Sequence, residues 1–110
     1  MDVKICAEIA AIWQKFQKVE SEGRALSVQV MALARDCSET DARFVEATQN
    51  GQDVTPILKE TRDNYLQRAE IAKAIQENQR EGEVLCRKAA DAFTRLISSA
   101  AGTPMRPPLA

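Results

Sequence analysis

Histidine is absent from the sequence, and cysteine occurs only three times. Histidine is the commonest metal ligand and general base in proteins, and it is the usual activator of a serine or cysteine nucleophile. Cys6, Cys37 and Cys86 are odd in number and form no C-x-x-C pair. We therefore expect three free thiols that pack within the fold, with no metal, no cofactor and no enzymatic activity.

Aromatic residues, glycine and proline are also scarce. Aromatics make up 5% of the chain, and glycine and proline occur four times each. Residues that favour helices, such as alanine, leucine, glutamate, glutamine, lysine and arginine, dominate instead. A chain of 110 residues has room for one small core. The composition therefore predicts a single all-α domain and argues against an α/β enzyme.

Neither sign of charge is in clear excess, and long hydrophobic runs are missing. Fifteen basic and sixteen acidic residues give a net charge of −1, with both signs interspersed, so nucleic acid and anionic membrane are unexpected partners. No stretch approaches the roughly 18 apolar residues of a membrane span. Residues 1–13 also lack the pattern of a secretory leader. We expect a protein of the reducing cytoplasm, without membrane contact.

The first half of the chain carries an apolar repeat in alternating steps of four and three residues. Its positions are Ile5, Ile9, Ile12, Phe16, Val19, Gly23, Leu26, Val30, Leu33, Cys37, Thr40, Phe44 and Ala47. A 3.5-residue period kept over about six heptads is typical of a helix that faces another helix along its full length. This part of the chain is therefore predicted to form one long helix.

The repeat stops at residues 49–56 and then resumes. Gly51 suits the left-handed residue after a helix end, while Thr55 and Pro56 suit an N-cap and a first helical position. The second series is Leu58, Thr61, Tyr65, Arg68, Ala72, Ile75, Gln79, Gly82, Cys86, Ala89, Phe93, Leu96 and Ala100, and it is flanked by a stripe of Ile57, Ile71, Leu85 and Ala92. We expect helices at about 3–49 and 56–100, joined by a turn at about 50–55. Residues 1–101 would form the helical domain, and the proline-rich residues 102–110 a disordered tail.

One local alternative concerns the segment DCSETD at residues 36–41. Ser38 and Asp41 have the spacing of a helix start and could divide the first helix near Arg35. The apolar repeat continues in phase through Cys37 and Phe44. A continuous helix is therefore the favoured reading.

The two interior glycines suggest a register for the hairpin. A turn centred between Gln52 and Asp53 places Gly23 opposite Gly82 and Val19 opposite Cys86. Facing glycines would mark either a close approach of the two backbones or a gap that admits a side chain of another subunit. Each interior glycine destabilises its helix by about 1 kcal/mol relative to alanine. The third possibility is that two such destabilising residues face each other by chance.

A long antiparallel two-helix hairpin of coiled-coil type cannot cover all of its own apolar residues. We expect these residues to be buried by assembly into a four-helix bundle or a hetero-oligomeric coiled coil. The expected interaction residues are Trp13, Gly23, Val28, Met31, Ile57, Leu66, Ile71, Gly82, Leu85 and Ile97. The leading function is a non-enzymatic protein-protein interaction or scaffolding module, acting as a homodimer or as a subunit of a larger assembly.

Two other functions remain as alternatives. The first is a secretion-related helical component or chaperone, which rests on analogy of shape alone. The second is an RNA-binding helical bundle. Acids precede arginines by four residues in pairs such as Glu83 and Arg87, and this pattern neutralises the helix surface and disfavours RNA.

Overall fold

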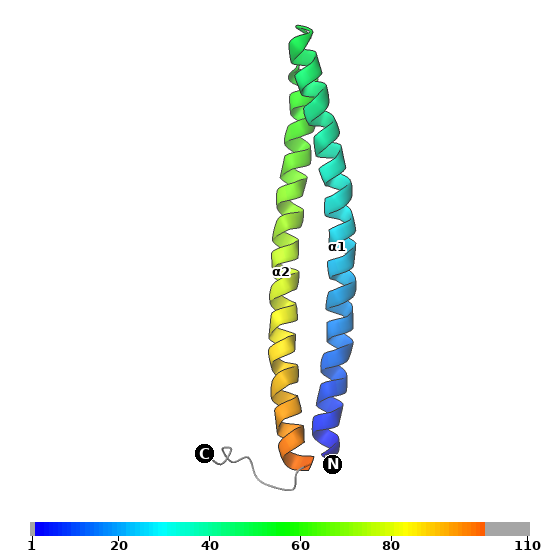
Figure 1. Ribbon diagram of the computed structural model, residues 1–110, viewed down its shortest axis with the longest axis vertical. Helices are drawn as coiled ribbons and strands as arrows, with labels where there is room; N and C mark the ends of the chain where they lie inside the picture. Colours follow the sequence, from blue (N-terminus) through cyan, green and yellow to red (C-terminus); the bar gives the residue numbers. More distant parts are fainter. Residues whose placement is uncertain (1, 101–110) are drawn as a thin grey trace. The chain divides into compact units, whose positions relative to one another are not determined.

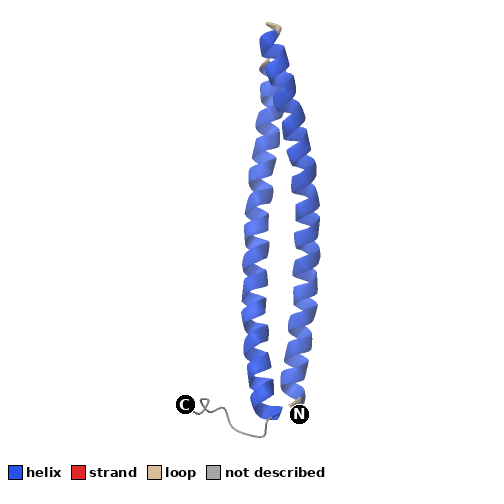
Figure 2. Ribbon diagram, in the orientation of Figure 1, coloured by secondary structure: helices blue, strands red, loops and turns tan. Residues whose placement is uncertain are grey.

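A computed structural model describes residues 2–100, and the predicted tail at 102–110 lies outside the described residues. Helix α1 comprises Val3–Gln49 and helix α2 comprises Thr55–Ala100, and residues 2–100 contain no strand. The two helices run in opposite directions from the loop that joins them (Figures 1 and 2). The predicted all-α antiparallel hairpin is confirmed.

Helix α1 continues without a break through residues 36–41, so the favoured reading of this segment is confirmed. Thr40 lies within this segment, and only 2% of its surface is exposed. Its hydroxyl donates to the carbonyl oxygens of Asp36 and Cys37 at 3.1 and 3.0 Å. A buried threonine therefore satisfies its hydrogen bond within its own helix, and helix α1 does not need to end here.

Both helices begin beside an aspartate side chain. Asp2 accepts hydrogen bonds from the backbone N–H groups of Lys4 and Ile5, and Asp53 accepts them from the backbone N–H and the hydroxyl of Thr55. An oxygen placed in this way pairs the N–H groups that a helix start leaves without an intrahelical partner. Asp53 therefore caps α2, and the assignment of Thr55 as the N-cap was wrong.

The loop reverses the chain at Gly51. This glycine has a φ of 66°, and its N–H donates to the carbonyl of Thr48, while the N–H of Gln52 donates to the carbonyl of Ala47. The two bonds form a Schellman motif, which ends a helix at a left-handed residue. The predicted role of Gly51 is confirmed.

The hairpin divides into two compact units, each made of one segment from each helix. We call residues 2–21 and 78–100 the terminal unit, and residues 22–77, which include the loop, the loop unit. All thirteen positions of the first apolar series are buried or half-buried, so the predicted seam of α1 is confirmed.

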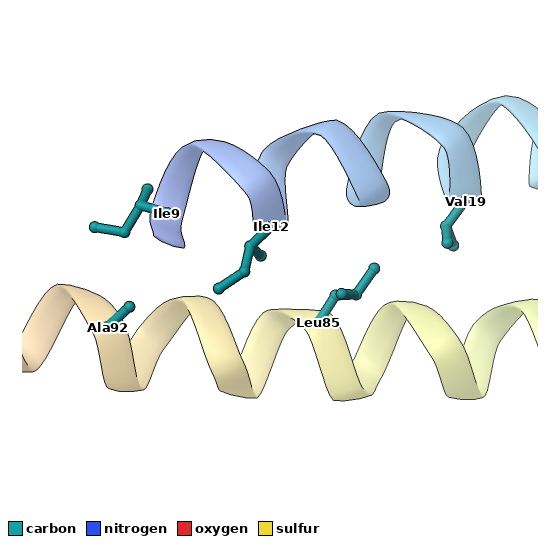
Figure 3. Packing of buried hydrophobic residues seen from close by; sticks show 5 residues of the cluster. All are labelled: Ile9, Ile12, Val19, Leu85 and Ala92. Carbon is teal, nitrogen blue, oxygen red and sulfur yellow. The ribbon is translucent and has the colours of Figure 1, made fainter. Parts of the chain in front are cut away.

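The terminal unit has a core of five buried side chains: Ile9, Ile12 and Val19 from α1, and Leu85 and Ala92 from α2. Figure 3 shows Leu85 and Ala92 pointing toward the three α1 residues. Ile5, Phe16, Ala89 and Leu96 pack against this core and are partly buried. Large and small side chains alternate across the seam, as close packing requires.

The register of the terminal unit differs from the predicted one. A Cβ placed on Gly82 would lie 3.8 Å from Cγ1 of Val19, and the side-chain amide of Asn78 donates to the carbonyl of Val19 at 2.9 Å. Val19 therefore lies opposite the turn that begins at Asn78, where the prediction placed Cys86. The predicted pairing of Val19 with Cys86 was therefore wrong.

The face that α2 presents to α1 also differs from the second predicted series. Leu85 and Ala92 are buried, whereas Cys86 and Phe93, which belong to that series, are exposed. The seam of α2 combines two sets of positions. It contains residues 57, 71, 85 and 92 of the flanking stripe and residues 61, 75, 82, 89 and 96 of the second series, and all of them are half-buried or buried. Half of the predicted series therefore lies one residue away from the true seam.

In the loop unit, Leu33, Cys37, Thr40 and Ala47 of α1 are buried, and Ile57, Thr61, Asn64 and Ile71 of α2 are half-buried. The hydroxyl of Thr61 is buried and has no hydrogen-bond partner within the described part of the chain. Several of these positions are polar, and polar groups gain less from burial than aliphatic ones. The seam of the loop unit thus gains less from burial at these polar positions than it would from aliphatic side chains.

Replacing Gly82 with alanine is expected to raise the free energy of unfolding by up to about 1 kcal/mol, because alanine favours the helix and its Cβ would make ordinary contact with Val19. The same change at Gly51 is expected to lower it by about 1 to 2 kcal/mol, because a side chain disfavours the left-handed conformation. Urea unfolding at a fixed protein concentration measures both changes. Destabilisation by Gly82→Ala would show that the backbones approach more closely than this contact indicates.

Candidate protein-interaction surface

Two different flanks border the seam of the terminal unit. Trp13 follows the seam residue Ile12, Phe93 follows Ala92, and the centroids of the two aromatic rings lie 6.2 Å apart. Residues that precede seam positions meet on the other side, where Arg95 contacts Glu8. In an antiparallel helix pair, the positions just after and just before the seam lie on opposite flanks.

The flank that contains Trp13 carries no charge over most of its length. Its heptad positions from residue 3 to 17 and from residue 86 to 100 are Val3, Cys6, Ala10, Trp13, Gln17, Cys86, Ala90, Phe93, Ile97 and Ala100, and the next positions along the two helices are the acidic Glu20 and Glu83. We call these ten residues the apolar flank. Ten positions on the other side form the charged flank: Lys4, Glu8, Ala11, Lys15, Lys18, Val84, Lys88, Asp91, Arg95 and Ser98. The two sides of the unit thus differ sharply in polarity.

The large side chains of the apolar flank are accessible to solvent. Val3 is 79% exposed, Trp13 55%, Phe93 38% and Ile97 70%. Trp13 and Phe93 form a tilted ring pair with an interplanar angle of 52°, which is a favourable aromatic arrangement and limits the freedom of both rings. Aromatic side chains held in place before binding lose little entropy when a partner covers them. Aromatic residues of this kind contribute a large share of the binding free energy in many protein interfaces.

The charged flank is held by ion pairs between the helices and within them. The guanidinium of Arg95 donates two hydrogen bonds to the carboxylate of Glu8, at 2.7 and 3.2 Å, and one to Asp91 at 3.2 Å. The bond from Arg95 lowers the pKa of Glu8, and the Glu8 carboxylate raises the pKa of Arg95. Exposed pairs of this kind contribute little stability, but they keep this side of the unit polar.

The stability of the hairpin is expected to fall as the pH drops below the ordinary carboxyl values. Hydrogen bonds lower the pKa of Glu8 from 4.5, and those donated by Thr55 lower the pKa of Asp53 from 3.8. A lowered pKa means that the charged form contributes stability above the ordinary value, and that this contribution is lost as the pH falls through the folded-state pKa. Urea midpoints measured from neutral pH downward test this. If the stability of the double variant Glu8→Gln, Asp53→Asn falls with pH as steeply as that of the unmodified protein, these two carboxyl groups do not cause the fall.

The loop unit has exposed apolar residues too, but charges lie among them. Met31, Val45, Leu58 and Tyr65 are exposed, and the hydroxyl of Tyr65 donates to the carboxylate of Asp41 at 2.9 Å. This hydrogen bond raises the pKa of Tyr65. Asp41 and Arg62 occupy the same heptad flank as Tyr65, so a partner here would have to accommodate charge. The terminal unit offers the more uniform apolar surface.

The expected interaction residues occupy three kinds of position. Trp13, Met31 and Ile97 lie on the flanks just described, and Val28 and Leu66 are exposed at other positions on the helices. Leu85 is 8% exposed and lies in the core, so it is unavailable to a partner. Gly23, Ile57, Ile71 and Gly82 are half-buried.

Sequence reasoning missed Val3 and Phe93 as surface residues. Phe93 was assigned to the seam together with Leu58, Tyr65 and Cys86, all of which are exposed. The stripe of Ile57, Ile71, Leu85 and Ala92 was the available signal, because compact apolar residues favour a tight helix-helix seam. Choosing this stripe as the seam at those positions would have moved Phe93 onto the flank beside Trp13.

Other features of the described residues can be compared with this surface. Within residues 2–100, no group of three or more metal-binding side chains lies close enough to hold an ion, and Cys6, Cys37 and Cys86 are free thiols. No helix in this range combines the length and the apolar composition that a membrane crossing requires. Comparisons with protein families, curated proteins and solved structures found no significant match to the chain. A functional proposal therefore rests on the geometry of the surface.

Proposed function

We propose that the protein is a non-enzymatic helical module for protein-protein interaction or scaffolding, and that it binds through the apolar flank of the terminal unit. The observation that carries this proposal is the contrast between the two flanks. Trp13, Phe93 and Ile97 lie exposed on a flank without charge, while the other flank is polar. An exposed apolar surface with a polar border is typical of an interaction site.

The energetic gain from covering this flank is substantial. Fully burying a large aliphatic or aromatic side chain contributes about 1.5 to 3 kcal/mol. Val3 and Ile97 retain most of their surface in the hairpin, and Trp13 retains about half. Binding of a partner that covers these side chains is therefore favoured by the burial of apolar surface that the hairpin alone leaves in water.

The charge pattern supports a protein partner over RNA. Arginine side chains that could bind phosphate are engaged with acids, as in Arg95 with Glu8, Arg87 with Glu83 and Arg43 with Glu60. Binding RNA would require breaking these pairs and would bring the acids near the phosphates. The three free thiols fit a reducing compartment such as the cytoplasm, which is the proposed location.

Position-specific photo-crosslinking in the cells that naturally make the protein tests this function. The photoreactive amino acid p-benzoylphenylalanine is introduced at Gln17, on the apolar flank, or at the adjacent Lys18, on the charged flank; both positions are exposed. Irradiation is expected to give protein adducts mainly from position 17. Equal yields at the two positions, or no protein adduct from either, would contradict an interaction through the apolar flank.

A further inference from the structure

We propose that the occupant of the apolar flank is a second copy of this chain, with the two flanks packed face to face around a two-fold axis. The inference rests on the proposed function and identifies its partner. The terminal units of two chains would then contribute four helical segments to one continuous core. Such an interface is isologous, because each copy uses the same residues.

The absence of charge favours self-association. In a two-fold interface every residue approaches the same surface on the other copy, so a net charge of either sign would oppose pairing. None of the ten positions of the apolar flank carries a charge, and the acidic Glu20 and Glu83 lie at the positions directly beyond Gln17 and Cys86. A surface of another protein that carries charges would have to bury them here without partners, whereas a second apolar flank buries none. Pairing of two apolar flanks therefore meets no charge repulsion and buries no unpaired charge among these ten positions.

The distribution of large and small side chains also suits pairing of two identical flanks. Each helix segment carries large residues, such as Trp13 and Phe93, at some heptad positions and alanine or cysteine at others, including Ala10, Cys86 and Ala90. Large side chains of one copy can therefore enter the spaces above small ones of the other. This is the packing by which helical bundles fill a core.

The area of the flank is of the order that a stable dimer requires. Taking 150 to 250 Å² for an aromatic side chain, the exposed parts of Trp13 and Phe93 amount to roughly 200 Å² per chain. This is about a quarter of the ~800 Å² that each partner contributes to an interface of standard size. Val3 and Ile97 are more exposed still, and six smaller or polar positions complete the flank. The flank alone can thus approach the standard size.

Two neighbouring alanines provide a matched test. Ala10 lies on the apolar flank and Ala11 on the charged flank, and both are exposed in the hairpin. Light scattering and sedimentation equilibrium of the full chain are expected to give twice the chain mass of 12.2 kDa. Ala10→Glu is expected to raise the dimer dissociation constant at least about tenfold, because it buries two carboxylates in the interface. Ala11→Glu is expected to leave the constant unchanged.

Trp13 supplies an independent readout, because it is the only tryptophan of the chain. On dilution of the unmodified protein, its emission is expected to shift to longer wavelength as the dimer dissociates and its exposed part returns to water. Ile97→Gln serves as a second variant if Ala10→Glu loses helical circular dichroism, because Ile97 is 70% exposed and contributes little to the hairpin itself. It too should weaken the dimer.

Two results would overturn the second copy as occupant: a helical chain of 12.2 kDa at every concentration, or a dimer that Ala10→Glu and Ile97→Gln leave intact. These results are distinct from failure of the proposed function. A helical monomer that still gives adducts from position 17 with a different protein keeps the interaction function and rejects self-association. Equal crosslinking at positions 17 and 18 rejects the interaction function itself.

Discussion

Leu85→Ala is expected to lower the free energy of unfolding by about 2 to 5 kcal/mol, which is the cost of removing a buried leucine side chain and leaving part of its volume empty. Leu85 lies in the core of the terminal unit with Ile12 and Val19, and its side chain points toward α1 (Figure 3). The loss is large because few other side chains of α2 are buried in this unit. Urea unfolding followed by circular dichroism measures the change.

Val84→Ala is the control for this experiment. Val84 immediately precedes Leu85, but 46% of its surface is exposed, so its truncation is expected to change the free energy of unfolding by less than about 0.5 kcal/mol. Both variants are compared at one protein concentration, because association would shift the apparent stability. Similar losses for Leu85→Ala and Val84→Ala would show that α2 is rotated relative to the described hairpin.

Ala92→Leu is expected to destabilise the hairpin by about 1 to 3 kcal/mol through overpacking. Ala92 is completely buried and lies close to Ile9 in the core. Leucine is a good helix former, so a loss of stability would come from the lack of space at the seam and not from helix propensity. The measurement is the thermal or urea midpoint of the variant.

Ala11→Leu provides the corresponding control on the surface. Ala11 is exposed on the charged flank, so a leucine side chain there can extend into solvent, and little change in stability is expected. An Ala92→Leu variant as stable as the unmodified chain would mean that the seam has room for a larger residue.

Local patterns in the sequence were sufficient to predict the helices and the seam of α1. The thirteen positions from Ile5 to Ala47 keep one phase, and every one of them is buried or half-buried in the hairpin. Gly51 also carried a local signal, because a left-handed residue is needed to end the helix and glycine adopts that conformation without strain. These features depend on residues close together in the chain.

The interaction surface was predictable only in part. Trp13 and Ile97 do not fit the seam, so the sequence indicates that something else covers them. In the apolar repeat of α2, Phe93 fits a seam position as well as its neighbour Ala92, and Tyr65 fits one better than its neighbour Asn64. A shift of one residue turns a helix by about 100°, so the choice between these neighbours decides which residues lie on the flank.

The sequence by itself determined that the chain forms two helices, where they are joined, and which side of α1 faces a neighbour, because helix propensity, capping and heptad phase are local. Only the tertiary structure decided which side of α2 meets α1 and in which register. Helix α2 carries two apolar stripes of similar quality, and packing against Val19 and Ile12 distinguishes them by placing Gly82, Leu85 and Ala92 at the seam. That packing leaves Phe93 beside Trp13 and thereby creates the apolar flank.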